Sequence, residues 1–263
     1  MWNPYEPLAP STRRGLGLAS VATIIAIWAT VSGLALVSPA RLPAPWQVGS
    51  AFVRLAWDPA TGQSRLLDAT IASVSRVLVA GVLVVIIGVP IGVLMGASPR
   101  LNAALSPLVD PFRSAPVVAL LPILVMWLGI GEAMKIAFLF IGAVVFLVPM
   151  VRDAVLAVPQ QHWISARDLG ATPWESVRLS VIPMARPRIA DAITVAVSVM
   201  WTYITVAEYV NAERGLGQLI QNARRFSAMD QVFVGIFVII TLALVTYFSM
   251  VAIKRRLYPW ETE

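Results

Sequence analysis

The sequence predicts an all-α polytopic membrane protein with six transmembrane helices. Apolar residues make up 58% and charged residues 13% of its 263 positions, and the charges lie mostly between long apolar runs. A soluble domain carries about 25% charged residues, which it needs to cover a water-facing surface. Most of this chain must therefore be solvated by lipid.

Six charge-free runs are candidates for the membrane-spanning helices, because about 20 apolar residues cross the hydrocarbon core. They are residues 15–38, 77–99, 114–131, 136–151, 192–207 and 231–253. The third to fifth runs are the shortest and have charged ends, which is typical of inner helices that line a wet pathway. The first run is longer than a signal-peptide core of roughly 7–15 residues, which favours an uncleaved span.

The positions of Lys and Arg predict the orientation, because cytoplasmic loops carry more of them. With the N-terminus inside, eleven lie on the cytoplasmic side, including Arg13 and Arg14 before the first run and three residues after the last. Seven lie outside. We therefore expect both termini in the cytoplasm, with an N-terminal segment 1–14, a transmembrane domain 15–256 that includes a cytoplasmic loop 152–188, and a tail 257–263.

The composition excludes several other functions. The net charge of +6 does not indicate nucleic-acid binding, because the basic residues lie at helix ends rather than in one patch. Without Cys and with His162 as the single histidine, neither a metal site nor a catalytic site is predicted. Neither lysine follows a glycine, so the phosphate-binding loop G-x-x-x-x-G-K-[ST] is absent. ATP hydrolysis by that route would require another polypeptide.

Two patterns within the spans predict packing and a pathway. Gly88, Gly92 and Gly96 recur every four residues, so they form one seam where a neighbouring helix can approach closely, either statically or as a sliding face. In the fifth run, polar side chains spaced by three or four form a stripe that we interpret as part of a translocation pathway: Ser198, Trp201, Thr202, Thr205 and Glu208. The alternative is that the hydroxyls bond their own helix and Glu208 faces water.

Two pairs of charges have the i, i+3 spacing that permits an ion pair on a helix. We expect Asp110 to pair with Arg113 as a structural contact near lipid. Glu132 and Lys135 are expected to form either a solvated pair at an outer turn or a contact surface for an external protein.

The loop 152–188 predicts two short helices separated at Gly170, because glycine tolerates the left-handed conformation that ends a helix. Thr172 and Pro173 suit the cap and first turn of the second helix. Such a rigid helix–turn–helix, carrying Trp163, Leu169 and Trp174, suits docking into a groove on a partner.

Part of this loop resembles the EAA loop of binding-protein-dependent ABC importers, on the run Ser165-Ala166-Arg167-Asp168-Leu169-Gly170-Ala171 followed by Ile182-Pro183. Ile164 stands where that family usually has a glutamate. Three further segments resemble the nitrate/sulfonate/taurine/bicarbonate branch: Trp127-Leu128-Gly129-Ile130-Gly131-Glu132, Val206-Ala207-Glu208 and Gly215-Leu216-Gly217.

The resemblance implies a type I ABC importer permease-like fold in the bacterial cytoplasmic (inner) membrane. The coupling helix would contact the ATPase through Ser165, Ala166, Arg167, Asp168, Leu169, Gly170, Ala171, Thr172 and Trp174. The implied partners are a second permease copy in a homodimer, two ATP-binding subunits that hold ATP and Mg, and an extracytoplasmic substrate-binding protein. Two other functions stay open: an ion-gradient-driven secondary carrier, and a non-transport scaffold that docks a cytosolic partner.

Overall fold

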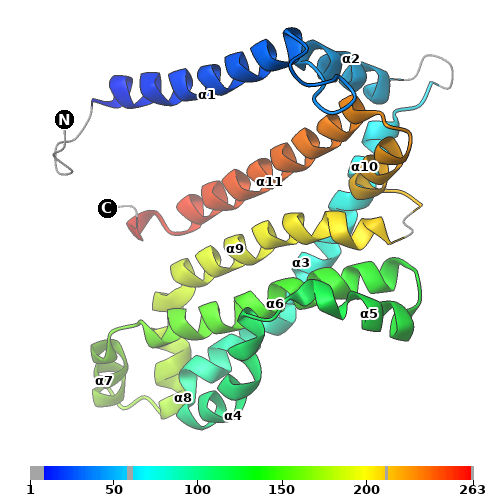
Figure 1. The fold of residues 1–263 in the computed structure, drawn as a ribbon. Coiled ribbons are helices and arrows are strands. Elements are labelled where there is room, and N and C mark those ends of the chain that lie inside the picture. Colours follow the sequence, from blue (N-terminus) through cyan, green and yellow to red (C-terminus); the bar gives the residue numbers. More distant parts are fainter. Residues whose placement is uncertain (1–8, 58–61, 211–212, 262–263) are drawn as a thin grey trace. The chain divides into compact units, whose positions relative to one another are not determined.

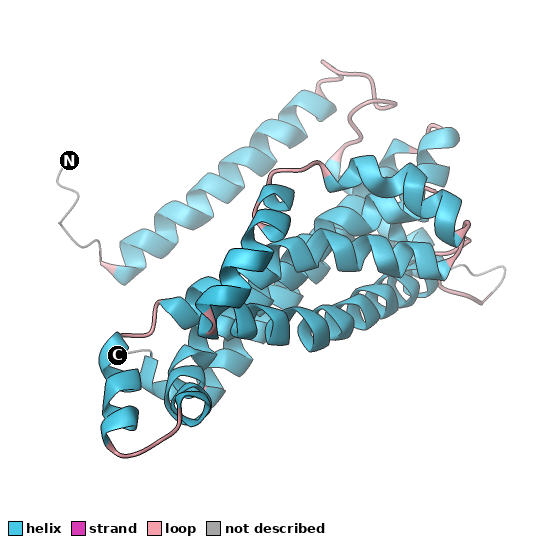
Figure 2. Ribbon diagram, turned by 90° about the horizontal axis from the view of Figure 1, so that it is seen from below, coloured by secondary structure: helices cyan, strands magenta, loops and turns pink. Residues whose placement is uncertain are grey.

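The computed structural model describes residues 9–57, 62–210 and 213–261, and these contain helices and connecting segments without a strand (Figures 1 and 2). The helices in chain order are α1 (Pro10–Gly33), α2 (Pro45–Ala56), α3 (Arg65–Ala97), α4 (Pro99–Val109), η1 (Pro111–Arg113), η2 (Val117–Leu120), α5 (Leu121–Leu128), α6 (Glu132–Leu156), α7 (Gln160–Asp168), α8 (Pro173–Ser176), η3 (Val177–Val181), α9 (Ile182–Tyr209), α10 (Leu216–Arg225), α11 (Met229–Leu257) and η4 (Pro259–Glu261).

The chain divides into two compact units, which we describe separately. Unit 1 comprises Met1–Arg65 and Ile220–Gly235, and unit 2 comprises Leu66–Leu219 and Ile236–Glu263. Unit 2 therefore holds nearly all of α3, all of α4 to α9, and most of α11.

The prediction of an all-α membrane protein is confirmed. In the described part of the chain, five helical segments are long and apolar enough to cross a membrane: Ser11–Gly33, Arg65–Ala97, Glu132–Leu156, Pro173–Tyr209 and Met229–Leu257. A sixth candidate is the bent pair Pro99–Arg113 and Val117–Leu128, whose two parts meet at 97°. Six spans result if this pair is one broken span.

The third predicted span is thus not a single straight helix over 114–131. Its break falls between η1 and η2, next to Pro116. A proline removes a backbone donor and disfavours the helical conformation in the preceding residue, here Ala115. By contrast, α3 and α6 continue through Pro90 and Pro149.

The fourth and fifth spans are longer than their charge-free runs predict, because α6 has 25 residues and α9 has 28. The helices continue through charged residues that have partners within unit 2. Arg152 of α6 binds Asp110 with N–O distances of 2.9 and 3.0 Å, and Lys254 binds Asp191 of α9 at 2.7 Å. Asp110 therefore pairs with Arg152, and the predicted pair with Arg113 is wrong.

The centre of unit 2 is the pair α6 and α9, which lie side by side (Figure 1). Phe138 and Leu139 of α6 and Met200 and Ile204 of α9 are fully buried. Burial of large apolar side chains on both helices favours one fixed pairing.

The three glycines Gly88, Gly92 and Gly96 of α3 lie against α6, where backbone atoms approach closely. A Cβ atom at Gly92 would lie 2.6 Å from the Cβ of Val151 and 2.7 Å from the carbonyl oxygen of Val148. A Cβ at Gly96 would lie 2.6 Å from the Cβ of Val155. These positions have no room for any larger side chain unless α3 and α6 move apart.

We expect Gly92→Ala to destabilise the protein by about 1–3 kcal/mol, the usual cost of overpacking a dense interior. The measurement is the thermal unfolding midpoint in detergent. Gly17→Ala in α1 is the control, because nothing lies within 4 Å of the position of its added Cβ and alanine favours a helix. Equal midpoints for the two variants would contradict the close packing.

Candidate coupling and translocation sites

The loop after α6 forms the predicted helical hairpin. Helix α7 ends at Asp168, and Gly170 has φ of +89°, in the left-handed region that favours glycine. Thr172 caps α8: its hydroxyl oxygen accepts from the Glu175 amide at 3.3 Å, while its amide donates to the Glu175 carboxylate at 2.7 Å. The prediction of two short helices separated at Gly170 is confirmed.

Hydrogen bonds brace the hairpin internally, and it presents apolar side chains to its surroundings. Ser180 donates a hydrogen bond to the His162 carbonyl at 2.9 Å, which ties α7 to the start of the next long helix. The Arg167 guanidinium lies over the Trp163 ring, 5.8 Å from its centroid, and donates to the Ala171 carbonyl. At the tip, Leu169 is 89% exposed and Trp174 is 53% exposed.

The remaining predicted coupling residues, Ser165, Ala166 and Asp168, lie on α7. In Figures 1 and 2 the hairpin forms one end of unit 2, beyond the ends of α6 and α9. It connects the C-terminus of α6 to the N-terminus of α9, so a force on the hairpin acts on both central helices.

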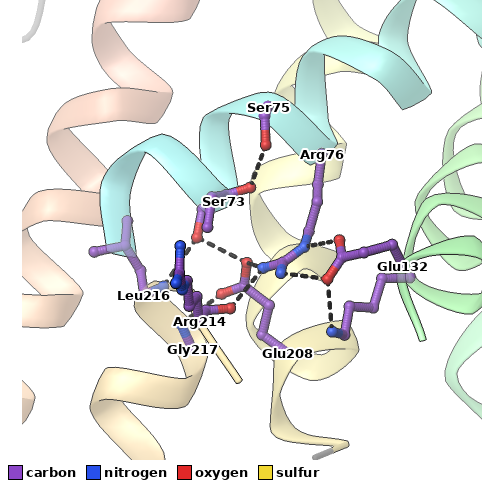
Figure 3. Close-up of polar contacts among 10 residues, drawn as sticks. Ser73, Ser75, Arg76, Glu132, Glu208, Arg214, Leu216 and Gly217 are labelled. Atoms are coloured by element: carbon purple, nitrogen blue, oxygen red, sulfur yellow. Dashed lines mark hydrogen bonds and ion pairs between the residues drawn. The ribbon is translucent and has the colours of Figure 1, made fainter. Parts of the chain in front are cut away.

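A cluster of charges, most of them buried, lies at the opposite end of α6 and α9, centred on Arg76 of α3 (Figure 3). Its guanidinium binds Glu132, at the start of α6, through Nε and Nη2 at 2.5 and 2.6 Å. Its Nη1 donates to Glu208, near the end of α9, at 2.6 Å and to the Arg214 carbonyl at 2.8 Å. One side chain thus joins three long helices and the segment after α9.

The two carboxylates that bind Arg76 differ in their exposure to solvent. Glu208 is 1% exposed, and it also accepts from the Ser73 hydroxyl and the Gly217 amide, each at 2.7 Å. The side chain of Glu132 is 57% exposed and also binds Lys135 at 3.0 Å, whereas Lys135 is 3% exposed. Glu132 and Lys135 are therefore not a fully solvated turn pair.

The glycines after α9 allow the chain to wrap around the Glu208 carboxylate. Gly215 has φ of +136° and is so close to this carboxylate that a Cβ would overlap it. A Cβ at Gly217 would lie 2.8 Å from the Cβ of Glu208 and 2.9 Å from the Thr205 carbonyl oxygen. The amide of Leu216, between the two glycines, donates to the Ser73 hydroxyl at 2.9 Å.

The predicted polar stripe on α9 divides into two parts. Trp201 and Glu208 are buried, and the Trp201 indole nitrogen donates to the Thr246 hydroxyl of α11 at 3.2 Å. Ser198 and Thr205 are half-buried and Thr202 is exposed. The Ser198, Thr202 and Thr205 hydroxyls donate to carbonyls of α9 itself. Ser198, Thr202 and Thr205 are therefore the part of the stripe that could line a pathway, and Glu208 has protein partners instead.

If the exposed part of the stripe lines a pathway, replacing Thr202 and Thr205 together by valine will change uptake kinetics. Loss of a hydrogen bond worth about 1 kcal/mol corresponds to an increase of about fivefold in KM. Thr241→Val on α11 is the matched control, because Thr241 is exposed and bonds its own helix at 2.8 Å. Unchanged uptake by the double variant would make the stripe purely structural.

Sequence reasoning did not connect Arg76, Ser73 and Glu132 with Glu208. The one available signal was that Arg76 precedes a charge-free run of 23 residues, 77–99, where an unpaired charge would be costly. Within the described residues, His, Cys, Asp and Glu form no group of three or more that could hold a metal ion.

Helices long and apolar enough to cross a membrane, with an exposed hairpin between the two central ones, define a polytopic membrane protein. Comparison with known proteins gives its family. The profile described as "Binding-protein-dependent transport system inner membrane component" matches residues 88–258. The chain belongs to this family.

Several relatives match nearly the whole chain, and two of them are named for the compounds that they transport. The taurine transport system permease protein TauC of Escherichia coli (strain K12) is 33% identical, over 94% of this chain and 90% of its own length. The putative aliphatic sulfonates transport permease protein SsuC of Bacillus subtilis (strain 168) is 28% identical, over 93% of this chain and 87% of its own.

Among solved structures, the MetNI methionine ABC transporter in an inward-facing conformation matches with a TM-score of 0.65 and 26% identity. The match covers 76% of this chain and 98% of that chain. The resemblance read from the loop, and its assignment to the taurine and sulfonate branch, are confirmed. The chain is the membrane-spanning permease subunit of an ATP-driven importer, which excludes the ion-gradient carrier and the scaffold.

Proposed function

We propose that two copies of this chain form a translocation pathway along their shared axis. In each copy, one ATP-binding subunit binds the α7–α8 hairpin. The observation that carries this proposal is the hairpin itself. It is held rigid by the Thr172 cap and the Ser180 contact, yet it leaves Leu169 almost fully exposed outside the long apolar helices. An exposed apolar tip outside the membrane-spanning helices supports docking to a protein partner.

In this mechanism ATP and Mg²⁺ are bound by the partner subunits, and closure of those subunits displaces the hairpin. Because the hairpin joins α6 to α9, it moves both central helices as one body. Helix α6 has 25 residues, which at 1.5 Å per residue is a length of about 38 Å. Movement at the hairpin would thereby reach the Arg76 cluster at the other end of unit 2 and alternate access to the pathway.

The solute is proposed to be a small sulfonate delivered by an extracytoplasmic binding protein. Support comes from the relatives, which are named for transport of taurine and of aliphatic sulfonates. The excess of Lys and Arg on one side supports cytoplasmic termini, including the segment 1–14 and the tail 257–263, so the hairpin would meet the ATP-binding subunits inside the cell.

The test is uptake of radiolabelled taurine into proteoliposomes that contain this chain, its ATP-binding subunit and its binding protein. Uptake should require ATP, should require the binding protein, and should stop with a non-hydrolysable ATP analogue. Uptake that follows an imposed ion gradient without ATP would refute the mechanism. If the binding protein stimulates ATP hydrolysis by the reconstituted complex but taurine does not accumulate, the mechanism holds and the solute is a different one.

A further inference from the structure

Helix α2 of unit 1 has three distinct faces. At 100° per residue, Val48, Ala51 and Leu55 lie together and are buried. A polar face follows, formed by Gln47, Ser50 and Arg54. The third face is apolar and exposed: Trp46 is 61% and Val53 is 65% exposed, and Phe52 and the following Trp57 are also exposed.

The N-terminal part of α2 lies against the end of the membrane-spanning helix α1. A Cβ atom at Gly33, the last residue of α1, would lie 3.4 Å from the Trp46 ring. The Trp28 indole nitrogen of α1 donates to the Pro43 carbonyl, just before α2, at 3.0 Å. Helix α2 therefore begins beside the end of α1.

The C-terminal part of α2 lies at the start of a second span. Arg54 donates to Asp230, in the first turn of α11, at 2.7 Å. The same short helix therefore runs from the end of one candidate span to the start of another. Its exposed apolar face contains no charged residue.

We propose that α2 lies along the membrane surface, with Trp46, Phe52 and Val53 in the boundary between lipid headgroups and acyl chains. Tryptophan is enriched at this depth because its ring is apolar and its N–H remains hydrated. Amphipathic helices in this position bury their apolar face about 5–10 Å into the boundary. The occupant of the third face is lipid.

Lipid is favoured over a protein partner because the face continues the lipid-facing surface of α1. Only 6% of the most apolar stretch of α1 is buried, and Ile24 and Ile27 are exposed along this helix. The polar face of α2 would then point to water, which agrees with the exposed Arg54–Asp230 ion pair. The proposed orientation makes this the extracytoplasmic surface, and the inference does not depend on the solute.

The chain contains no Cys, so one nitroxide spin label can be attached at a chosen position without removing native thiols. The variants are Phe52→Cys and Val53→Cys on the apolar face, with Ser50→Cys on the polar face as the matched control. Each full-length variant is placed in lipid nanodiscs. Electron paramagnetic resonance then measures collisions of the label with oxygen, which concentrates in lipid, and with a water-soluble nickel chelate.

Labels at positions 52 and 53 are expected to collide more with oxygen than with nickel, at a depth of about 5–10 Å below the phosphates. The label at position 50 should show the reverse. Nickel access at 52 and 53 equal to that at 50 would overturn the proposal, because the face would then be in water. Protection of 52 and 53 from both reagents would also overturn it, since a second copy or another protein would then cover the face.

Discussion

Leu169→Asp is expected to abolish ATP-dependent uptake while leaving the permease folded. Leu169 is 89% exposed at the tip of the hairpin, so the change removes no internal packing. At an interface, loss of a central apolar contact costs roughly 2 kcal/mol or more, which is about a 30-fold loss of affinity. The measurements are co-purification of the ATP-binding subunit with the permease and uptake into proteoliposomes.

Gln161→Asp is the matched control for this variant, because it adds the same charge to an exposed position on α7 of the same hairpin. The Gln161→Asp variant should retain most of the ATP-dependent uptake. Normal uptake by Leu169→Asp would show that the tip is not the coupling contact. If Leu169→Asp still binds the ATP-binding subunit and the complex hydrolyses ATP without uptake, the hairpin transmits force from that subunit. This result would also support a coupling role.

Glu208→Ala is expected to reduce the yield of folded protein severely. The change leaves Arg76, which is 5% exposed, without its buried carboxylate and also removes the acceptor for Ser73 and Gly217. Breaking a buried ion pair by removing one partner costs about 3–5 kcal/mol. The measurements are the amount of membrane-inserted protein and its thermal unfolding midpoint.

Glu132→Ala removes the other carboxylate that binds Arg76 and is the control. The Glu132 side chain is 57% exposed, so its removal opens the buried Arg76 and Lys135 to water, and the effect should be smaller than that of Glu208→Ala. If the thermal unfolding midpoint of Glu132→Ala is equal to or below that of Glu208→Ala, Glu208 is not the main partner of Arg76.

The hairpin could be predicted in detail because its determinants are local. A glycine that adopts a positive φ at 170, and a threonine followed by proline at 172, act through their own backbone and their nearest neighbours. The structure reproduces both features. Proline also acts on its own backbone and its nearest neighbours, which explains why the helix breaks next to Pro116.

The Arg76 cluster could not be predicted because its members come from four separate segments. Glu132 and Glu208 lie 56 and 132 residues from Arg76 along the chain. Helical spacing brings together only residues three or four apart, so it suggested the pair Asp110–Arg113, whereas Asp110 binds Arg152 of α6. Charge pairing between helices depends on their rotation and depth, which periodicity does not specify.

The sequence by itself determined that this chain is an all-helical membrane protein and where its α7–α8 hairpin turns, because apolar run length and glycine or proline chemistry act locally. The tertiary structure decided which side of α9 is buried and that Arg76 binds both Glu132 and Glu208. It also decided that α2 lies against the ends of α1 and α11 in unit 1. These outcomes depend on helix packing, in which close contacts at residues such as Gly92 fix how neighbouring helices face one another.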